Sequence, residues 1–168
     1  MQISVRYIPG EPSFDSLEVI KLCCDRSIDI NSRIYGQTQI GRNEELLFAK
    51  ILSFESEPTA DSTVMLELRL GENALSAQVR FDGSSSLILN GMDENDKLSA
   101  YIISGEDLQG EYWGAVIMLP MALLLGHFSL SENALPASVY GNIIRREPAV
   151  SSAAPLSESA EITIMPKS

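Results

Sequence analysis

The sequence predicts an all-β protein, an antiparallel β-sandwich of two packed sheets, on three observations. Short stretches in which apolar and polar residues alternate recur along most of the chain, and a period of two is typical of half-buried strands. Turn residues separate these stretches at intervals of roughly 8–12 residues, which is the spacing of sandwiches and barrels. The connections are short, and parallel pairs need crossovers of about a dozen residues or more, so we expect antiparallel pairing.

The first third of the chain is expected to form four strands, at residues 3–7, 17–25, 27–36 and 45–56. A proline–glycine turn at positions 9 and 10 ends the first of them. The strand at 45–56 is rich in aliphatic and aromatic residues, which favours a central position in a sheet.

The clearest hairpin follows an aspartate–serine turn at positions 61 and 62. In its first strand, residues 64–70, the aliphatic residues fall on one side, and Met65, Glu67 and Arg69 fall on the other. A Gly-Glu-Asn turn leads into the second strand, residues 75–81, which alternates in the same way.

The second half of the chain contains further short strands and the one predicted helix. The helix is expected at 119–126, where proline comes early and glycine comes at the end. The strand at 135–147 contains Gly141, which indicates a bulge or a close approach of another backbone. A loop follows at 148–161, and a last strand closes the chain at 161–165. The remaining predicted strands of this half are 86–91, 98–104 and 111–119.

Composition and charge predict a single globular domain over residues 1–168. Hydrophobic residues make up 45% of the chain, charged residues 21%, and the net charge is −11. A surface that negative repels phosphate backbones and anionic lipid head groups, so we expect neither a nucleic acid nor a membrane partner. No apolar run approaches the roughly 20 residues that span a bilayer, and the N-terminus lacks a secretory pattern. The adjacent Cys23 and Cys24 suit a reducing compartment, so a cytoplasmic location is expected.

Several stretches between about residues 44 and 147 follow one another in an order known from one family. They are "EELLFAKILSFESEP", "DSTVMLELRL", "LSAQVRFDGSSSLILNG", "YWGAVIMLPMALL" and "GNIIRRE". This order resembles that of the bacterial carbohydrate-binding family 9-like domains, which are relatives of the DOMON-type β-sandwich.

The resemblance implies a non-catalytic ligand-binding domain with a saccharide as the class of ligand. Aromatic stacking and hydrogen bonds to hydroxyls, on a sheet face or at its rim, would hold the sugar. Sugar-binding members of the family place the ligand between two tryptophans, whereas this sequence contains only Trp113. A second hypothesis is a structural or assembly domain whose face or edge meets another subunit, for example in a homo-oligomer.

Five residues are candidates for ligand contacts: Asp61, Trp113, Tyr140, Asn142 and Arg145. Asp61 suits a hard cation or a sugar hydroxyl, and it also suits an Asx turn whose carboxylate accepts backbone N–H bonds. Tyr140 and Asn142 share one strand face and would offer a sugar a ring and an amide. Arg145 falls on the opposite face, where it bonds a ligand hydroxyl or pairs with a carboxylate. Trp113 alternates with apolar residues, which favours the core over a binding platform.

The sequence predicts neither a metal site nor an enzyme. His127 is the only histidine, whereas zinc needs several nitrogen or sulfur ligands at suitable spacing. No G-x-S-x-G elbow occurs, and no nucleophile, base and orienting group can be named from spacing. The acidic segment 92–97 lacks the ligand spacing of an EF-hand. It is expected to be a solvated loop, with weak calcium binding as the alternative interpretation.

Overall fold

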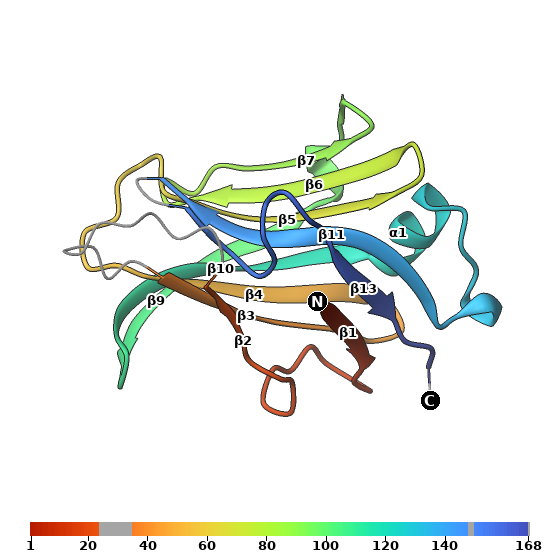
Figure 1. Ribbon diagram of the computed structural model, residues 1–168, viewed down its shortest axis with the longest axis horizontal. Coiled ribbons are helices and arrows are strands. Elements are labelled where there is room, and N and C mark those ends of the chain that lie inside the picture. Colours follow the sequence, from red (N-terminus) through yellow and green to blue (C-terminus); the bar gives the residue numbers. More distant parts are fainter. Residues whose placement is uncertain (24–34, 148–149, 168) are drawn as a thin grey trace.

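The computed structural model describes residues 1–23, 35–147 and 150–167, which form two curled, packed sheets (Figure 1). The first sheet contains β5, β6, β7 and β11, and the second contains β3, β4, β9 and β10. The strands are β1 (Gln2–Tyr7), β2 (Ile20–Leu22), β3 (Tyr35–Arg42), β4 (Leu46–Phe54), β5 (Thr63–Leu70), β6 (Asn73–Arg80), β7 (Ser85–Leu89), β8 (Met92–Asp93), β9 (Ser99–Asp107), β10 (Gly110–Pro120), β11 (Ala137–Arg146), β12 (Ser151–Ser152) and β13 (Ala160–Ile164). The helices are α1 (Met121–His127) and the short 3₁₀ turns η1 (Asn95–Lys97) and η2 (Glu132–Ala134).

The two sheets are joined through β1. The strand order is β8-β7-β6-β5-β11-β13-β1-β3-β4-β10-β9, with β12 beside β11 and β2 beside β3. The predicted antiparallel sandwich is confirmed, with one exception among the described strands. β1 runs parallel to β13 through residues 2–5 and parallel to β3 through Arg6 and Tyr7. The chain between β1 and either partner is long enough for a parallel crossover, so the argument from short connections does not apply to this strand.

Alternation along the strands decides which side chains fill the space between the sheets. In the first sheet Leu66 lies opposite Ala77 and Ile143, and all three are completely buried. In the second sheet Ile51 and Ala115 are paired and equally buried. Successive side chains point to opposite faces of a sheet, so the polar residues between these positions lie on the outer faces.

Two strands near the N-terminus differ from their predicted bounds. β2 is shorter than the strand predicted at 17–25. β3 begins where the strand predicted at 27–36 was expected to end, and residues 24–34 lie outside the described part of the chain. The inward positions of β3 include Thr38 and Ile40, which are 1% and 3% exposed. Because small and polar residues carry much of its alternation, apolar periodicity does not reveal this strand.

The predicted helix is confirmed, but it begins two residues later. Leu119 and Pro120 still pair with β4 as the end of β10, and α1 starts at Met121. Proline therefore stands directly before the helix, where its missing N–H costs no helical hydrogen bond.

The predicted loop at 148–161 contains regular structure in its described part, residues 150–161. Ser151 and Ser152 form β12 on β11, and the stretch from Ser151 to Ala154 is buried. The segment lies across the outer face of β11, because Asn142 on that face bonds the backbone of Ala154. Its small side chains allow this close packing, and the same composition is typical of a loop when the sequence is viewed alone.

No helix in the described ranges has the length and apolar content needed to cross a bilayer.

Candidate ligand-binding site on the outer face of the first sheet

An open depression of about 350 Å³ lies on the first sheet. The strands beneath it, β5, β6, β7 and β11, run side by side (Figure 1). We call it the outer-face depression. Its lining includes Glu67 and Arg69 from β5, Ser76 from β6, Ile88 from β7 and Tyr140 from β11. The segment 156–159, which follows β12, forms one wall.

The sheet register brings the polar side chains of the depression together. Glu67 lies opposite Ser76 on one side and Asn142 on the other. Two residues along β5, Arg69 lies opposite Tyr140. Neighbouring strands are about 4.8 Å apart. Four different groups therefore lie close together on this face: the carboxylate of Glu67, the guanidinium of Arg69, the hydroxyl of Ser76 and the phenol ring of Tyr140.

The polar side chains on this floor are not used by the fold. Among the described residues, the side chains of Glu67, Arg69, Ser76 and Tyr140 form no hydrogen bond or ion pair. Tyr140 is 45% exposed, so a large part of this residue is accessible to solvent. The depression therefore offers hydrogen-bond acceptors, charged donors and an aromatic surface to a ligand.

Asn142 builds the wall of the depression instead of its floor. Its Nδ2 donates to the Ala154 carbonyl at 2.8 Å, and its Oδ1 accepts from the backbone N–H of Ala154 at 3.0 Å and of Ile143 at 2.9 Å. The side chain is 5% exposed. The covering segment therefore occupies the carbonyl and one amide hydrogen of this side chain, and a ligand contact of Asn142 stays a prediction.

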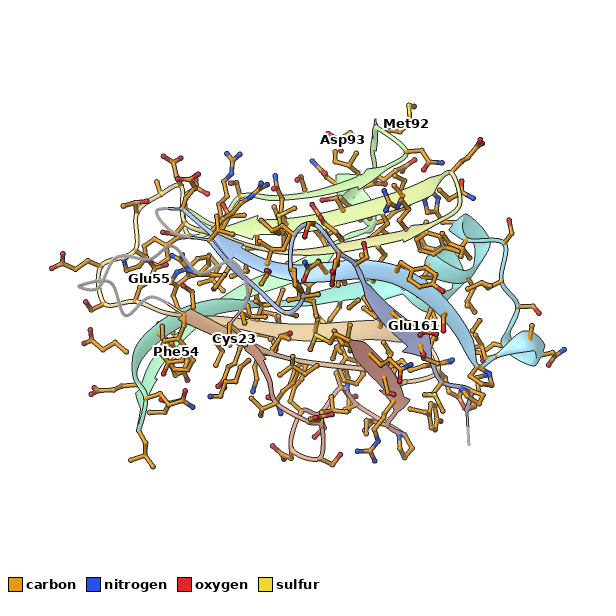
Figure 2. The ribbon with its side chains drawn as sticks, viewed as in Figure 1. Cys23, Phe54, Glu55, Met92, Asp93 and Glu161 are labelled. Carbon is orange, nitrogen blue, oxygen red and sulfur yellow. The ribbon has the colours of Figure 1, made fainter. Side chains whose placement is uncertain are left out.

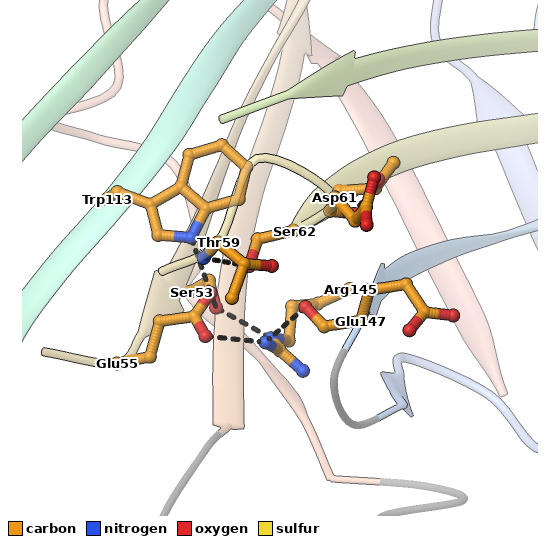
Figure 3. A network of polar contacts seen from close by, with 9 residues as sticks. Ser53, Glu55, Thr59, Asp61, Ser62, Trp113, Arg145 and Glu147 are labelled. Carbon is orange, nitrogen blue, oxygen red and sulfur yellow. Dashed lines mark hydrogen bonds and ion pairs between the residues drawn. The ribbon is translucent and has the colours of Figure 1, made fainter. Parts of the chain in front are cut away.

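Arg145 points to the opposite face of β11, as the alternation predicts, and lies in the core. Its Nε donates to Ser53 Oγ at 2.6 Å, and its Nη2 donates to Glu55 Oε2 at 2.9 Å (Figure 3). A further bond runs from Nη2 to the Glu147 carbonyl at 3.1 Å. Of the two predicted roles, pairing with a carboxylate is the one that the structure shows. Burial lowers the pKa of Arg145, and the Glu55 carboxylate opposes that shift.

Trp113 shares this buried network. It is 1% exposed, and its Nε1 donates to Glu55 Oε1 at 2.5 Å. Phe81 packs against the indole in an edge-to-face contact with ring centroids 5.4 Å apart. Trp113 is therefore a core residue and offers no face to a ligand. The Glu55 carboxylate accepts hydrogen bonds from Trp113, Ser53 and Arg145. The sequence did not identify Glu55 as a functional candidate.

Asp61 lies apart from both the network and the depression. Its residue is exposed, and Figure 3 shows its carboxylate turned away from the dashed contacts around Arg145. The turn is closed by Ser62, whose Oγ accepts the Thr59 N–H at 3.1 Å. Asp61 contributes its backbone carbonyl, which accepts from Thr63 Oγ1 at 2.8 Å. The turn is therefore stabilised by serine, and a ligand role for the Asp61 carboxylate stays a prediction.

The acidic segment 92–97 is tied to the end of the first sheet. Met92 and Asp93 form β8 at the outer end of this sheet, beyond β7 (Figure 2). The Asp93 carboxylate accepts from the Asn95 backbone at 3.0 Å, and Glu94 pairs with Lys97 at 3.1 Å. In the described ranges, no three His, Cys, Asp or Glu side chains are grouped to hold a metal ion. Weak calcium binding here stays a prediction.

Sequence reasoning missed Glu67, Arg69 and Ser76 as site residues. The alternation of the hairpin already placed Glu67 and Arg69 opposite the aliphatic side of their strand. What it could not show is that β11 lies beside β5, which brings Tyr140 next to Arg69.

No protein-family model matches this sequence, and no curated protein is significantly similar to it. Solved structures, in contrast, share its fold. A carbohydrate-binding module of family 9 from Caldicellulosiruptor kristjanssonii, in complex with glucose, matches with a TM-score of 0.68 and 11% identity, covering 100% of this chain and 97% of that one. The same kind of module in complex with cellotriose matches with a TM-score of 0.67 and 12% identity, covering 100% and 95%.

A third structure with this fold is described as a putative carbohydrate-binding protein from Bacteroides uniformis. It matches with a TM-score of 0.64 and 13% identity, covering 97% of this chain and 98% of that chain. These matches span nearly the full length of each structure, and they show that this chain has the fold of the family 9 carbohydrate-binding modules.

Proposed function

We propose that this protein, which has the fold of the family 9 carbohydrate-binding modules, is a non-catalytic domain that binds a saccharide in the outer-face depression. One observation carries the proposal. The exposed ring of Tyr140 lies beside Glu67, Arg69 and Ser76, whose side chains are unused by the rest of the described structure. The carbohydrate-binding descriptions of the structural neighbours support the same class of ligand.

The chemistry of the depression matches that of a sugar. The apolar side of a pyranose ring packs on an aromatic ring, here Tyr140. Sugar hydroxyls donate to a carboxylate such as Glu67 and accept from a guanidinium such as Arg69, and bonds to charged groups are the stronger kind. Because these groups stand on paired strands, the site is formed before the ligand arrives, which lowers the ordering cost of binding.

The test is calorimetric titration with glucose and cellotriose, preceded by a glycan array that extends the search to other sugars. Tyr140→Ala should weaken binding by about tenfold or more, because it removes the stacking surface. The matched control is Tyr101→Ala on β9 in the second sheet, where the tyrosine is 52% exposed. This control should leave affinity unchanged. The proposal is overturned if no sugar binds, or if both tyrosine variants bind equally well.

The fluorescence of Trp113 provides an independent check on the location of the site. Trp113 lies between the sheets and is 1% exposed, so a sugar in the outer-face depression should leave its emission wavelength and its quenching by iodide unchanged. A large sugar-dependent change in either would place the ligand near the indole, outside the depression.

A second candidate function, assembly with another copy of the chain, is favoured by one strand edge. Within the described residues β9 pairs only with β10, so one side of its backbone is free to add a strand. Tyr101 on β9 is 52% exposed, and Leu108 in the following turn is completely exposed. Sedimentation velocity over a hundredfold range of concentration tests this candidate. A mass that stays monomeric contradicts it.

A further inference from the structure

We propose that the outer-face depression continues along β6 and β7 as a polar groove, and that this groove holds further residues of a saccharide chain. The inference rests on the proposed function and adds a preference for oligosaccharides over monosaccharides. It is carried by a second depression of about 200 Å³ on the same strands, lined by Gln78, Arg80, Ser84, Ser85 and Ser86.

The two depressions are consecutive along one face of the sheet. Ser76 and Ile88 form a cross-strand pair that lines the first, and Gln78 and Ser86 form the next same-face pair, which lines the second. Side chains two residues apart on a strand share a face, so no strand separates the two spaces. From Ser76 to Arg80 the groove runs about 13 Å at ~3.3 Å per residue, which is enough for more than one pyranose ring.

The second depression has the chemistry of a hydroxyl-binding surface without a stacking platform. Gln78 and Ser86 are half-buried, and each can both donate and accept a hydrogen bond. In the described structure neither side chain forms a hydrogen bond, and Arg80 interacts through its charge with the nearby Asp82 carboxylate. Ser84 is occupied by the Asp82 carboxylate at 2.6 Å. A ligand would thus be stacked and oriented at Tyr140 and held by neutral hydrogen bonds further along.

This arrangement predicts that substitutions in the second depression change the affinity for long ligands and not the affinity for short ones. A glucose ring stacked on Tyr140 fills only the first depression, whereas a cellotriose bound there extends into the second. Removing the groups of the second depression should therefore weaken the longer ligand alone. A purely structural role for Gln78 and Ser86 would weaken both ligands together or neither.

The experiment compares glucose and cellotriose on the intact chain and on the Gln78→Ala/Ser86→Ala double variant. Cellotriose should bind the native protein at least about fivefold more tightly than glucose, and the double variant should lose about tenfold for cellotriose while glucose binding stays unchanged. The control is Gln2→Ala/Ser99→Ala, which removes the same two residue types from exposed positions on β1 and β9. It should leave both affinities at the native values.

A second measurement does not depend on any substitution. In heteronuclear NMR spectra, the amide signals of Ser85 and Ser86 should move on addition of cellotriose and stay in place on addition of glucose. Equal affinity for the two sugars, or equal losses in the double variant, overturns the groove and leaves the Tyr140 site standing. Failure of both sugars to bind removes the groove together with the proposed function.

Discussion

Arg145 and Arg42 are fully buried, and each forms an ion pair with a carboxylate. The two pairs lie near opposite ends of β4. Arg145 bonds Ser53 and Glu55 at one end, while Arg42 lies opposite Leu47 on β4 at the other and bonds Glu132. A buried charge without its partner is costly, since the interior cannot replace water as a solvent for it. The two ion pairs therefore hold in place the segments that carry the carboxylates, which are the residues after β4 for Glu55 and η2 for Glu132.

Loss of one member of the Arg145 pair should be severe. Arg145→Met leaves the 8%-exposed Glu55 with a buried charge and removes its strongest partner, so we expect a loss of about 3–5 kcal/mol in the free energy of unfolding. The control is Arg146→Met, because Arg146 is its exposed neighbour on the same strand. Its effect should stay within about 0.5 kcal/mol. Urea denaturation measures both, and equal midpoints for the two variants would contradict the prediction.

The Arg42 pair should make stability depend on pH. The hydrogen bond from Arg42 holds the pKa of Glu132 below its ordinary value of 4.5. A lowered folded-state pKa means that the carboxylate stabilises the fold above that ordinary value, and that this contribution is lost as the pH falls through the lowered pKa.

Glu132→Gln should therefore lower the free energy of unfolding by about 1–2 kcal/mol at neutral pH, a small value because the Glu132 side chain is 32% exposed. The difference from the native protein should shrink as the pH falls below 4.5. Thermal unfolding between neutral pH and about pH 3 measures it. Glu72→Gln, in the exposed turn between β5 and β6, serves as the control and should show no such convergence.

At the scale of residues, the sequence identified the candidate site only in part. Tyr140 could be placed on an outer face from alternation alone, and it lies in the depression. Asn142 shares that face, but its amide is used by Ala154. That contact joins residues 12 apart through a segment with no regular pattern, and no local rule predicts it.

At the scale of elements, β11 connects the candidate site to the core. Its outer side carries Tyr140 and Asn142, and its inner side carries Arg145. Gly141, between them, shows a close backbone approach and not a bulge, because its pairing with Leu68 is continuous with that of both neighbours. A Cβ added there would lie 1.8 Å from the Glu67 carbonyl oxygen. Of the two predicted reasons for this glycine, close approach is confirmed.

Gly141→Ala should force β11 away from β5 and disturb the floor of the depression. We expect a destabilisation of more than about 2 kcal/mol, since the contact is with backbone and cannot be relieved by a side-chain rotation. Gly126→Ala is the control, because no atom lies within 4 Å of a Cβ there and the residue is in α1. It should be neutral or stabilising by about 0.5–1 kcal/mol. Chemical denaturation compares the two, and a stable Gly141→Ala protein would refute the close approach.

At the scale of the whole molecule, β1 holds the two sheets together. It pairs with β13 of the first sheet and then with β3 of the second, and its inward side chains Ile3 and Val5 are 2% and 0% exposed. The sandwich is thus closed along this side by a single strand that belongs to both layers.

Ile3→Ala should weaken this junction and lower the free energy of unfolding by about 2–5 kcal/mol, the cost of a large-to-small change in a packed core. Ser4→Ala, on the exposed side of the same strand, should have little effect. Hydrogen exchange adds a spatial readout, because the amides of β13 and β3 should lose protection together in the Ile3→Ala variant. Loss confined to one sheet would show that β1 does not couple them.

The sequence by itself determined the class of the fold and the two faces of most strands, because alternation is a local property and burial selects it directly. It also placed the α-helix α1, because proline and glycine restrict or free the backbone at their own positions. Only the tertiary structure decided that β11 lies beside β5, that a low-complexity segment covers Asn142, and that Glu55 receives Arg145. Each of these depends on contacts between residues far apart in the chain, where the free energy comes from shape and charge complementarity that no local pattern records.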